Sequence, residues 1–229
     1  MASDLPELDD FKGSVRLFPL PNLVLFPTML QGLHIFEPRY RQMTADALED
    51  DRLLAPVLLQ PGWEAHYQGN PSVHPVACLG KIIADKRLDD GRYNLQVRGL
   101  CRVRILRELS NGKLYRTAQV ELLPDVAMYS AHAEKALRRK LAKRLPAWNT
   151  LQGTVQNVLL KVLQCNLPLG TVCDILSFAL PLSVEMKQEL LEKIDVERRA
   201  RALLRILEAQ APADGEQAVR RFPPEFSAN

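Results

Sequence analysis

The chain has 229 residues, 47% hydrophobic and 25% charged, which is enough apolar material for a core and excludes a disordered chain. Its 30 Lys and Arg against 27 Asp and Glu leave a net charge of +3, too small to imply a nucleic-acid or membrane partner by bulk charge. No window of about 20 residues is apolar and free of charge, and the N-terminus lacks the basic and apolar regions of a signal peptide, so we expect a cytoplasmic protein with no membrane partner.

Strand patterns dominate the first half of the chain. Residues 14–20 alternate up to a proline, and residues 23–27 form a continuous apolar run that predicts a strand buried on both faces. A helix is expected to begin at Pro38, where a missing N–H costs nothing. Further strands are predicted at residues 53–59, 76–85, 92–105 and 114–123.

Turn residues shape the longest of these strands. The tripeptide DDG at residues 89–91 predicts a hairpin, because glycine tolerates a positive φ. Apolar and polar residues alternate over residues 93–98, as in a half-buried antiparallel strand, and Gly99 predicts a bulge or sharp bend. Six or more strands with one intervening helix indicate a strongly bent sheet or small barrel.

After Pro124 the apolar period changes to 3.6 residues. Helices are predicted at residues 130–145, 155–163, 171–180, 183–194 and 195–207, with Ser130, Ser183 and Asp195 as N-caps. The expected fold class is therefore α+β: a bent β-sheet or pseudo-barrel followed by an α-helical bundle. We expect an N-terminal extension (1–13), a β-domain (14–124), a helical domain (125–211) and a C-terminal tail (212–229).

The usual signatures of catalysis are missing. There is no phosphate-binding loop G-x-x-x-x-G-K-[ST], no G-x-G-x-x-G and no G-x-S-x-G. We therefore expect a protein that is not an enzyme, without catalytic residues or a cofactor. The four cysteines show no C-x-x-C spacing and the four histidines no ligand spacing, which predicts no metal site and four buried or half-buried reduced thiols: Cys78, Cys101, Cys165 and Cys173.

Two basic features stand out. The polar face of the long hairpin carries four arginines, Arg92, Arg98, Arg102 and Arg104. They could neutralise phosphates, but a solvated sheet face is the favoured interpretation because no aromatic residues interleave to stack bases. The first C-terminal helix carries Lys135, Arg138, Arg139, Lys140, Lys143 and Arg144. That run is read as a solvated helix face, with docking of an acidic partner as the alternative.

Four segments resemble the N-terminal domain of the Lon proteases. They are PLPNLVLFP (residues 19–27), LHIFEPRYRQM (residues 33–43), VRGLCR (residues 97–102) and LPLSVEMKQ (residues 180–188). The resemblance runs from Val15 to Glu208 and implies a PUA-like β-domain followed by helices. The segments of the chain that carry it include neither the ATPase nor the peptidase module of that family, so the family's peptidase activity is not carried over and a stand-alone Lon-domain protein is expected.

The resemblance implies a substrate-recognition role: a binding module, adaptor-like or holdase-like, for unfolded or tagged polypeptide. Its expected site is a groove between the β-domain and the helical half, where the sheet offers edge backbone groups to an added strand. Phe26, Phe36 and Tyr40 are the candidate peptide-binding residues, although core packing is the ordinary interpretation of each phenylalanine. The alternative function is RNA binding through the PUA-like fold and the Arg92–Arg104 basic face.

Overall fold

The computed structural model describes residues 8, 11–66, 69–110, 112–147 and 153–209. Contacts divide the described residues into two compact units, the first ending at Pro124 and the second beginning at Asp125. The predicted tail at residues 212–229 and most of the predicted extension at residues 1–13 lie outside the described residues.

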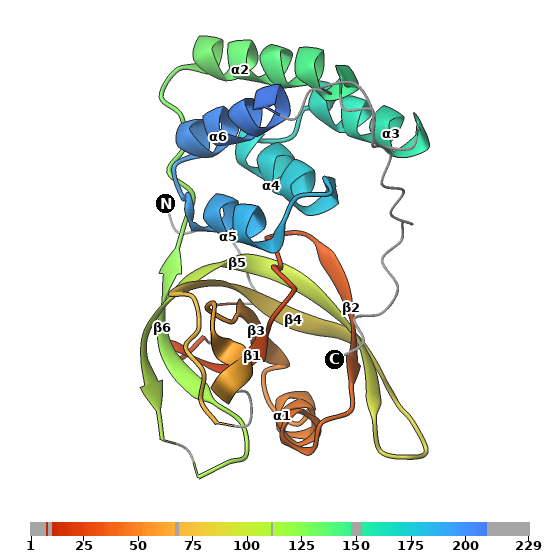
Figure 1. Ribbon diagram of the computed structural model, residues 1–229, viewed down its shortest axis with the longest axis vertical. Coiled ribbons are helices and arrows are strands. Elements are labelled where there is room, and N and C mark those ends of the chain that lie inside the picture. Colours follow the sequence, from red (N-terminus) through yellow and green to blue (C-terminus); the bar gives the residue numbers. More distant parts are fainter. Residues whose placement is uncertain (1–7, 9–10, 67–68, 111, 148–152, 210–229) are drawn as a thin grey trace. The chain divides into compact units, whose positions relative to one another are not determined.

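The first unit is a six-stranded sheet with one α-helix (Figure 1). Its strands are β1 (Ser14–Leu20), β2 (Leu30–Ile35), β3 (Leu53–Leu58), β4 (Val76–Arg87), β5 (Tyr93–Leu109) and β6 (Thr117–Leu123). The helix α1 (Pro38–Leu48) connects β2 to β3 and has its proline in the first turn, as predicted. A short 3₁₀ helix, η2 (Trp63–His66), lies in the loop between β3 and β4.

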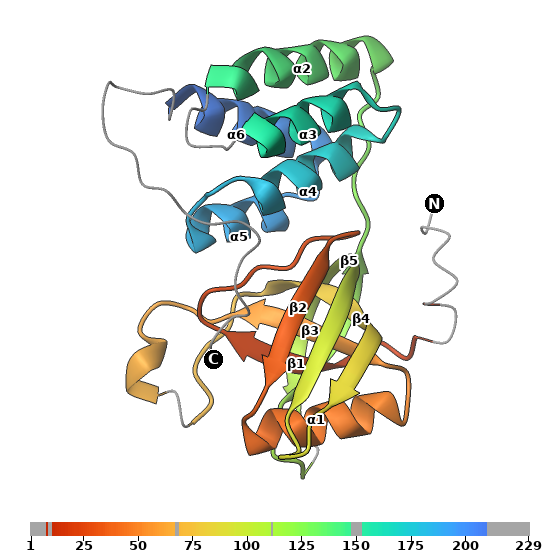
Figure 2. The same ribbon diagram turned by 90° about the vertical axis from the view of Figure 1, so that its right-hand side faces the viewer.

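Five of the strands close into a ring. β1 pairs in parallel with β3, and antiparallel pairs then follow from β3 to β4, β4 to β5, β5 to β6 and β6 back to β1. β5 is 17 residues long, and its first half pairs with β2 on the side opposite β4 (Figure 2). The predicted small barrel is thus confirmed, with β2 attached to it as a sixth strand.

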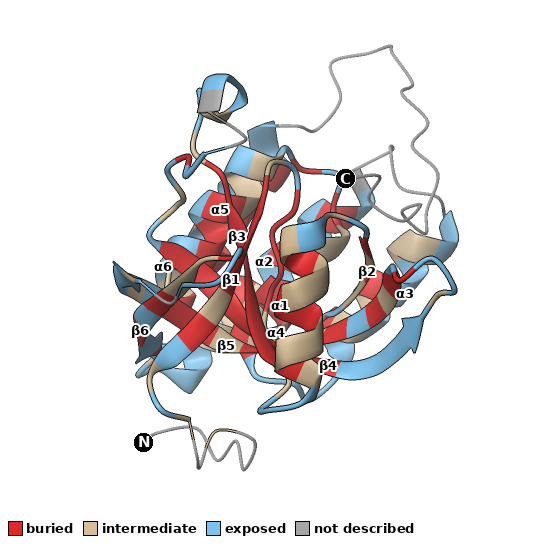
Figure 3. Ribbon diagram, turned by 90° about the horizontal axis from the view of Figure 1, so that it is seen from below, coloured by how far each residue is buried: buried red, intermediate tan, exposed pale blue. Residues whose placement is uncertain are grey.

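The inside of the ring is apolar. The core cluster is Val15, Leu17, Leu53, Ala55, Val57, Ala77, Leu79, Leu100, Val103, Ala118 and Val120. Outside it, α1 buries Tyr40, Met43 and Ala47 on one face (Figure 3), and the Phe18 and Tyr40 rings meet edge to face at 4.6 Å. Burial of this helix face holds the β2–α1 connection to the barrel.

A bulge in β5 confirms the expectation for Gly99. Leu79 lies opposite Cys101 and Gly80 opposite Gly99, so Leu100 is the extra residue. The insertion changes which face later residues of the strand occupy, and it brings Leu100 into the barrel core.

Residues 23–27 do not form the predicted strand. They make a buried irregular segment, which ends in a turn where Thr28 has a φ of 65°. The Thr28 N–H donates to the Gly99 carbonyl and the Gly99 N–H donates to the Met29 carbonyl, both over 2.9 Å. A continuous apolar run is compatible with a buried loop as well as with a buried strand. Hydrophobic periodicity therefore could not distinguish the two.

The second unit contains five α-helices among its described residues. They are α2 (Ala131–Arg144), α3 (Gly153–Gln164), α4 (Leu169–Ala179), α5 (Val184–Glu192) and α6 (Val196–Ala209), with a 3₁₀ turn η3 (Leu145–Ala147) after α2. The predicted caps are confirmed: Ser130 and Ser183 accept from backbone N–H groups over 3.2 and 3.3 Å, and Asp195 accepts from Arg198 over 2.8 Å.

A buried arginine ties this helical unit together. Arg199 of α6 has no exposed surface, and its guanidinium forms a two-bond pair with Asp125 and an ion pair with Asp174 of α4 at 3.4 Å. It also donates to the Lys193 carbonyl over 2.6 Å. Gly170 leaves room for this arrangement, because a Cβ there would lie 2.4 Å from an Asp125 carboxylate oxygen.

All four cysteines are free, as predicted, but Cys165 is exposed rather than buried because it follows the last turn of α3. None of the helices in the described parts of the chain combines the length and the apolar character needed to cross a membrane.

Candidate functional site

β2 has one free edge within the first unit. It stands at the end of the strand order, and β5 is its single neighbour among the described strands. Backbone groups in an antiparallel pair alternate between facing the partner and facing away. The Gly99 N–H donates to the Met29 carbonyl, so the backbone of Met29 faces β5. By alternation, the backbone N–H and C=O groups of Gln31, Leu33 and Ile35 also face β5. The N–H and C=O groups of Leu30, Gly32 and His34 therefore point to the free edge.

The outer face of β2 carries apolar side chains beside that edge. Leu30 is 56% exposed and Phe36, just beyond the strand, 39% exposed. Between them His34 contacts the Asn94 amide oxygen at 2.7 Å and stacks on Phe36 with ring centroids 6.2 Å apart. The opposite face is buried, with Leu33 and Ile35 in the core, so register is fixed while the outer face stays open.

The turn from β2 into α1 borders a small hollow in the surface. Its lining residues are Pro19, Arg39, Tyr40, Leu59, Gly69, Pro71 and Arg116. The Arg39 guanidinium lies 4.6 Å from the centre of the Tyr40 ring and pairs with Glu37 over 2.9 Å. The Tyr40 hydroxyl donates to the Pro19 carbonyl over 3.4 Å, which holds the aromatic wall in place.

The three aromatic candidates have different environments. Phe26 is fully buried and is a core residue, which corrects its assignment as a peptide contact. Tyr40 is 5% exposed and reaches the surface only as a wall of the hollow. Phe36 alone of the three presents substantial surface. The strand β2 was not predicted from the sequence. The signal for it was the alternation of polar or small and apolar residues over Gly32, Leu33, His34 and Ile35.

The four arginines of the hairpin do not form the common exposed face predicted for them. Arg102 is 2% exposed, because the bulge and the strands around it enclose that part of β5. Arg92 pairs with Asp90 at 2.6 Å and Arg104 with Glu121 at 3.4 Å, so two of the positive charges are locally compensated. Arg98 is half-buried. These contacts leave the RNA-binding alternative without a continuous basic surface.

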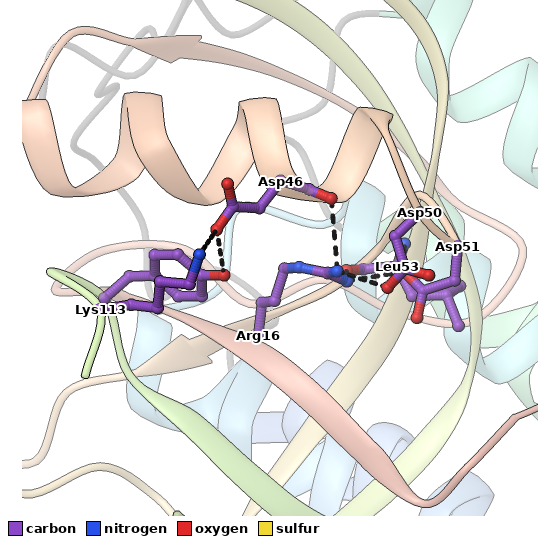
Figure 4. Close-up of polar contacts among 7 residues, drawn as sticks. Arg16, Asp46, Asp50, Asp51, Leu53 and Lys113 are labelled. Carbon is purple, nitrogen blue, oxygen red and sulfur yellow. Dashed lines mark hydrogen bonds and ion pairs between the residues drawn. The ribbon is translucent and has the colours of Figure 1, made fainter. Parts of the chain in front are cut away.

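A cluster of charged groups ties β1 to the end of α1 (Figure 4). Arg16 donates to Asp50 and to Asp51, each over 2.6 Å, and it also reaches the Asp46 carbonyl at 3.4 Å. The Asp46 carboxylate accepts from the Tyr115 hydroxyl over 2.8 Å and pairs with Lys113 at 3.1 Å. Every carboxylate in the cluster has a partner, so we interpret it as a structural clasp.

This clasp predicts an acid-sensitive contribution to stability. Partial burial alone would raise the pKa of Asp46, but the hydrogen bonds from Tyr115 and Lys113 outweigh burial, so the pKa lies below its usual value of 3.8. The hydrogen bond from Arg16 lowers the pKa of Asp50 in the same way. The ionised carboxylates of Asp46 and Asp50 stabilise the fold above pH about 4. This contribution to stability is lost as the pH falls through their lowered pKa values. We expect Asp46→Asn to cost about 1 kcal/mol at neutral pH and progressively less below pH about 4 in urea unfolding.

The matched control is Asp89→Asn, at an exposed position in the β4–β5 turn. Asp89→Asn should leave the free energy of unfolding unchanged at neutral pH and below pH about 4. A cost for Asp46→Asn that stays constant down to pH about 2 would contradict a charge-based clasp.

Two other groups have strongly shifted pKa values. Burial raises the pKa of the Cys101 thiol to about 11, which disfavours the reactive thiolate. Burial lowers the pKa of Lys187 to about 8, and its amine donates to the Phe178 carbonyl over 2.8 Å at the end of α4. Lys187 therefore caps a helix. In the described residues no three His, Cys, Asp or Glu side chains gather in a group that could hold a metal ion.

The fold is that of a small β-barrel joined in sequence to a helical unit, with an open strand edge. The family model for the ATP-dependent protease La (LON) substrate-binding domain matches residues 14–209. The chain therefore belongs to the Lon substrate-binding domain family, which confirms the resemblance inferred from its motifs.

Two Lon proteases are similar to most of this chain. Lon protease 2 of Syntrophobacter fumaroxidans is 30% identical over 178 residues, covering 78% of this chain and 22% of the relative. Lon protease of Dictyoglomus thermophilum is 24% identical over 196 residues, covering 86% of this chain and 24% of the relative. The chain thus spans less than a quarter of the length of these relatives.

Two solved structures share the fold. The N-terminal domain of Lon protease from the Mycobacterium avium complex aligns with a TM-score of 0.67 at 20% identity, covering 85% of this chain and 98% of that one. A Lon N-terminal domain protein from Xanthomonas campestris aligns with a TM-score of 0.58 at 24% identity, covering 87% and 99%. These neighbours confirm the α+β fold class.

Proposed function

We propose that the protein binds extended segments of polypeptide by adding them as a strand to the free edge of β2. The observation that carries the proposal is the row of outward backbone groups at Leu30, Gly32 and His34. Main-chain hydrogen bonds of this kind are independent of sequence, as recognition of unfolded or tagged clients requires. Membership of a substrate-binding domain family supports the ligand class.

The side chains beside the edge give the added strand its apolar contacts. Leu30 and Phe36 lie at its two ends on the outer face. The Gly32 carbonyl accepts from the Gln31 side-chain amide over 2.9 Å, a bond that an arriving strand would replace. An unfolded client must be ordered on binding, which costs about 2–5 kcal/mol, so we expect affinities on the order of micromolar.

The protein then acts as a binding module of the adaptor or holdase type, without chemistry of its own. The family match covers the substrate-binding domain. Bound clients should therefore remain intact, and we propose that they are met in the cytoplasm. The hairpin arginines offer no continuous surface, so RNA binding is not proposed as a second function.

The test uses an uncharged, labelled peptide of about ten residues built from Val, Thr and Ser, which adds a strand without charge effects. Binding by fluorescence anisotropy should weaken about tenfold or more in Leu30→Asp and in Gly32→Pro, because proline removes an outward donor without breaking the β5 ladder. The amides of Leu30, Gly32 and His34 should gain protection from hydrogen exchange when the peptide is added.

Leu106→Asp is the matched control, since Leu106 is 54% exposed against 56% for Leu30. It should bind the peptide as the wild type does. Equal losses in Leu106→Asp and Leu30→Asp, or protection that appears on β4 or β6 instead of β2, would refute strand addition at this edge.

A further inference from the structure

The exposed face of α2 carries positive charge in a single row. Lys135, Arg139 and Lys143 fall within an arc of about 80° on the side opposite the buried Leu137 and Leu141, counting 100° per residue. Lys135, Arg139 and Lys143 follow one another at four-residue spacing and are all exposed. We call Lys135, Arg139 and Lys143 the α2 ridge.

Two other cations of α2, Arg138 and Arg144, have structural tasks. Arg138 donates to the Cys165 carbonyl over 3.0 Å and to the Leu167 carbonyl, which caps the end of α3, and it pairs with Glu134 at 3.5 Å. Arg144 pairs with Glu208 of α6 at 3.4 Å. The basic run of the sequence thus contains two arginines that hold helices together, Arg138 and Arg144, and a ridge that does not.

The α2 ridge lacks the compensation seen on its neighbours. On α6, Arg201 pairs with Glu197 at 2.6 Å and Arg198 lies 3.9 Å from Asp195. Within the described part of the chain, by contrast, the ridge residues make no ion pair; the one polar contact is from Arg139 to the Lys135 carbonyl, at 3.4 Å. Like charges at four-residue spacing repel one another, so the ridge opposes the helix that carries it. A solvated face that only kept the protein soluble would mix both signs, as α6 does.

We propose that the α2 ridge docks an acidic, extended or helical segment of a partner protein. Charge complementarity is the basis: a row of cations about 12 Å long matches carboxylates repeating along a partner segment. This surface is separate from the β2 edge and does not depend on the function proposed for that edge.

A protein partner is favoured over nucleic acid by the rest of the helix. α2 contains no Phe, Tyr or Trp to stack on a base. Its small neighbours on the exposed side, Ala131 and Ala136, leave the ridge accessible to a second chain.

The test compares three labelled probes with the full chain in anisotropy titrations at low and physiological salt. They are a Glu–Ser peptide of about ten residues, its Gln–Ser analogue, and a single-stranded oligonucleotide of equal charge. The acidic peptide should bind and weaken as salt rises, the neutral analogue should not bind, and the oligonucleotide should bind less tightly. Changing Lys135, Arg139 and Lys143 together to Gln should weaken the acidic peptide about tenfold or more.

Two controls separate the α2 ridge from bulk charge and from misfolding. Lys161, Arg198 and Arg205 changed together to Gln remove the same charge from exposed positions on other helices and should leave binding intact. Arg139→Glu should lose binding without lowering the thermal midpoint, because it forms favourable pairs with Lys135 and Lys143. Equal losses in both triple variants, or tighter binding of the oligonucleotide than of the peptide, would overturn the proposal. Leu30→Asp should bind the acidic peptide normally, which keeps the two surfaces distinguishable.

Discussion

Gly99→Ala is expected to destabilise the β-barrel unit by about 3 kcal/mol, at the upper end of the usual cost of overpacking. A Cβ at this position would lie 2.1 Å from the Phe26 carbonyl oxygen and 3.0 Å from the Cys78 sulfur. The Phe26 side chain has no exposed surface, so the backbone that carries it cannot retreat without opening the core. The two hydrogen bonds that Gly99 makes with Thr28 and Met29 would be lost in the same movement.

Urea unfolding of the purified wild type and of the Gly99→Ala variant measures this loss of stability. Gly153→Ala is the matched control, because nothing lies within 4 Å of a Cβ on Gly153, the first residue of α3. It should be neutral or slightly stabilising, since alanine restricts the unfolded chain more than glycine. If Gly99→Ala and Gly153→Ala unfolded at the same urea concentration, that result would contradict a close packing of the Phe26 backbone against β5 at Gly99.

The course of the chain through the β-barrel shows what periodicity can and cannot predict. Alternation over residues 93–98 placed Tyr93, Leu95 and Val97 inside correctly, because one face of that strand is buried. The Gly99 bulge was also predicted, but its consequence was not. One inserted residue resets which side chains face the core, and the burial of Arg102 follows from pairing with both β4 and β6. Those pairings are long-range and have no signature in the local pattern.

The candidate edge was harder to predict than the barrel. β2 follows an apolar run that looks more like a strand than β2 does, and Gly32 and His34 interrupt its apolar character. Whether an edge is free depends on which strands pair elsewhere in the chain, and no window of the sequence contains that information. Phe26 and Phe36 have the same residue type, yet one is fully buried and the other is 39% exposed.

The buried arginine of the helical unit was likewise missed, although its position carried a signal. Arg199 lies four residues before Leu203 and eight before Leu207, on the face of α6 that the pattern assigned to the core. A charged residue in such a row predicts buried acidic partners. Those partners come from residues 25 and 74 positions away, Asp174 and Asp125, which only the packed helices bring together.

Arg199→Met is accordingly expected to destabilise the helical unit by about 3–5 kcal/mol, the cost of breaking a buried ion pair. The methionine fills much of the same space, but it leaves the Asp174 carboxylate, whose side chain is 4% exposed, without its cation. The Lys193 carbonyl loses a donor as well. Adding Asp174→Leu to Arg199→Met should restore a large part of the loss, because it removes the stranded charge. Arg201→Met, at an exposed pair on the same helix, should cost no more than about 0.5 kcal/mol. Thermal unfolding monitored by the helical circular dichroism signal compares the four proteins, and similar midpoints for Arg199→Met and Arg201→Met would contradict a buried ionic anchor.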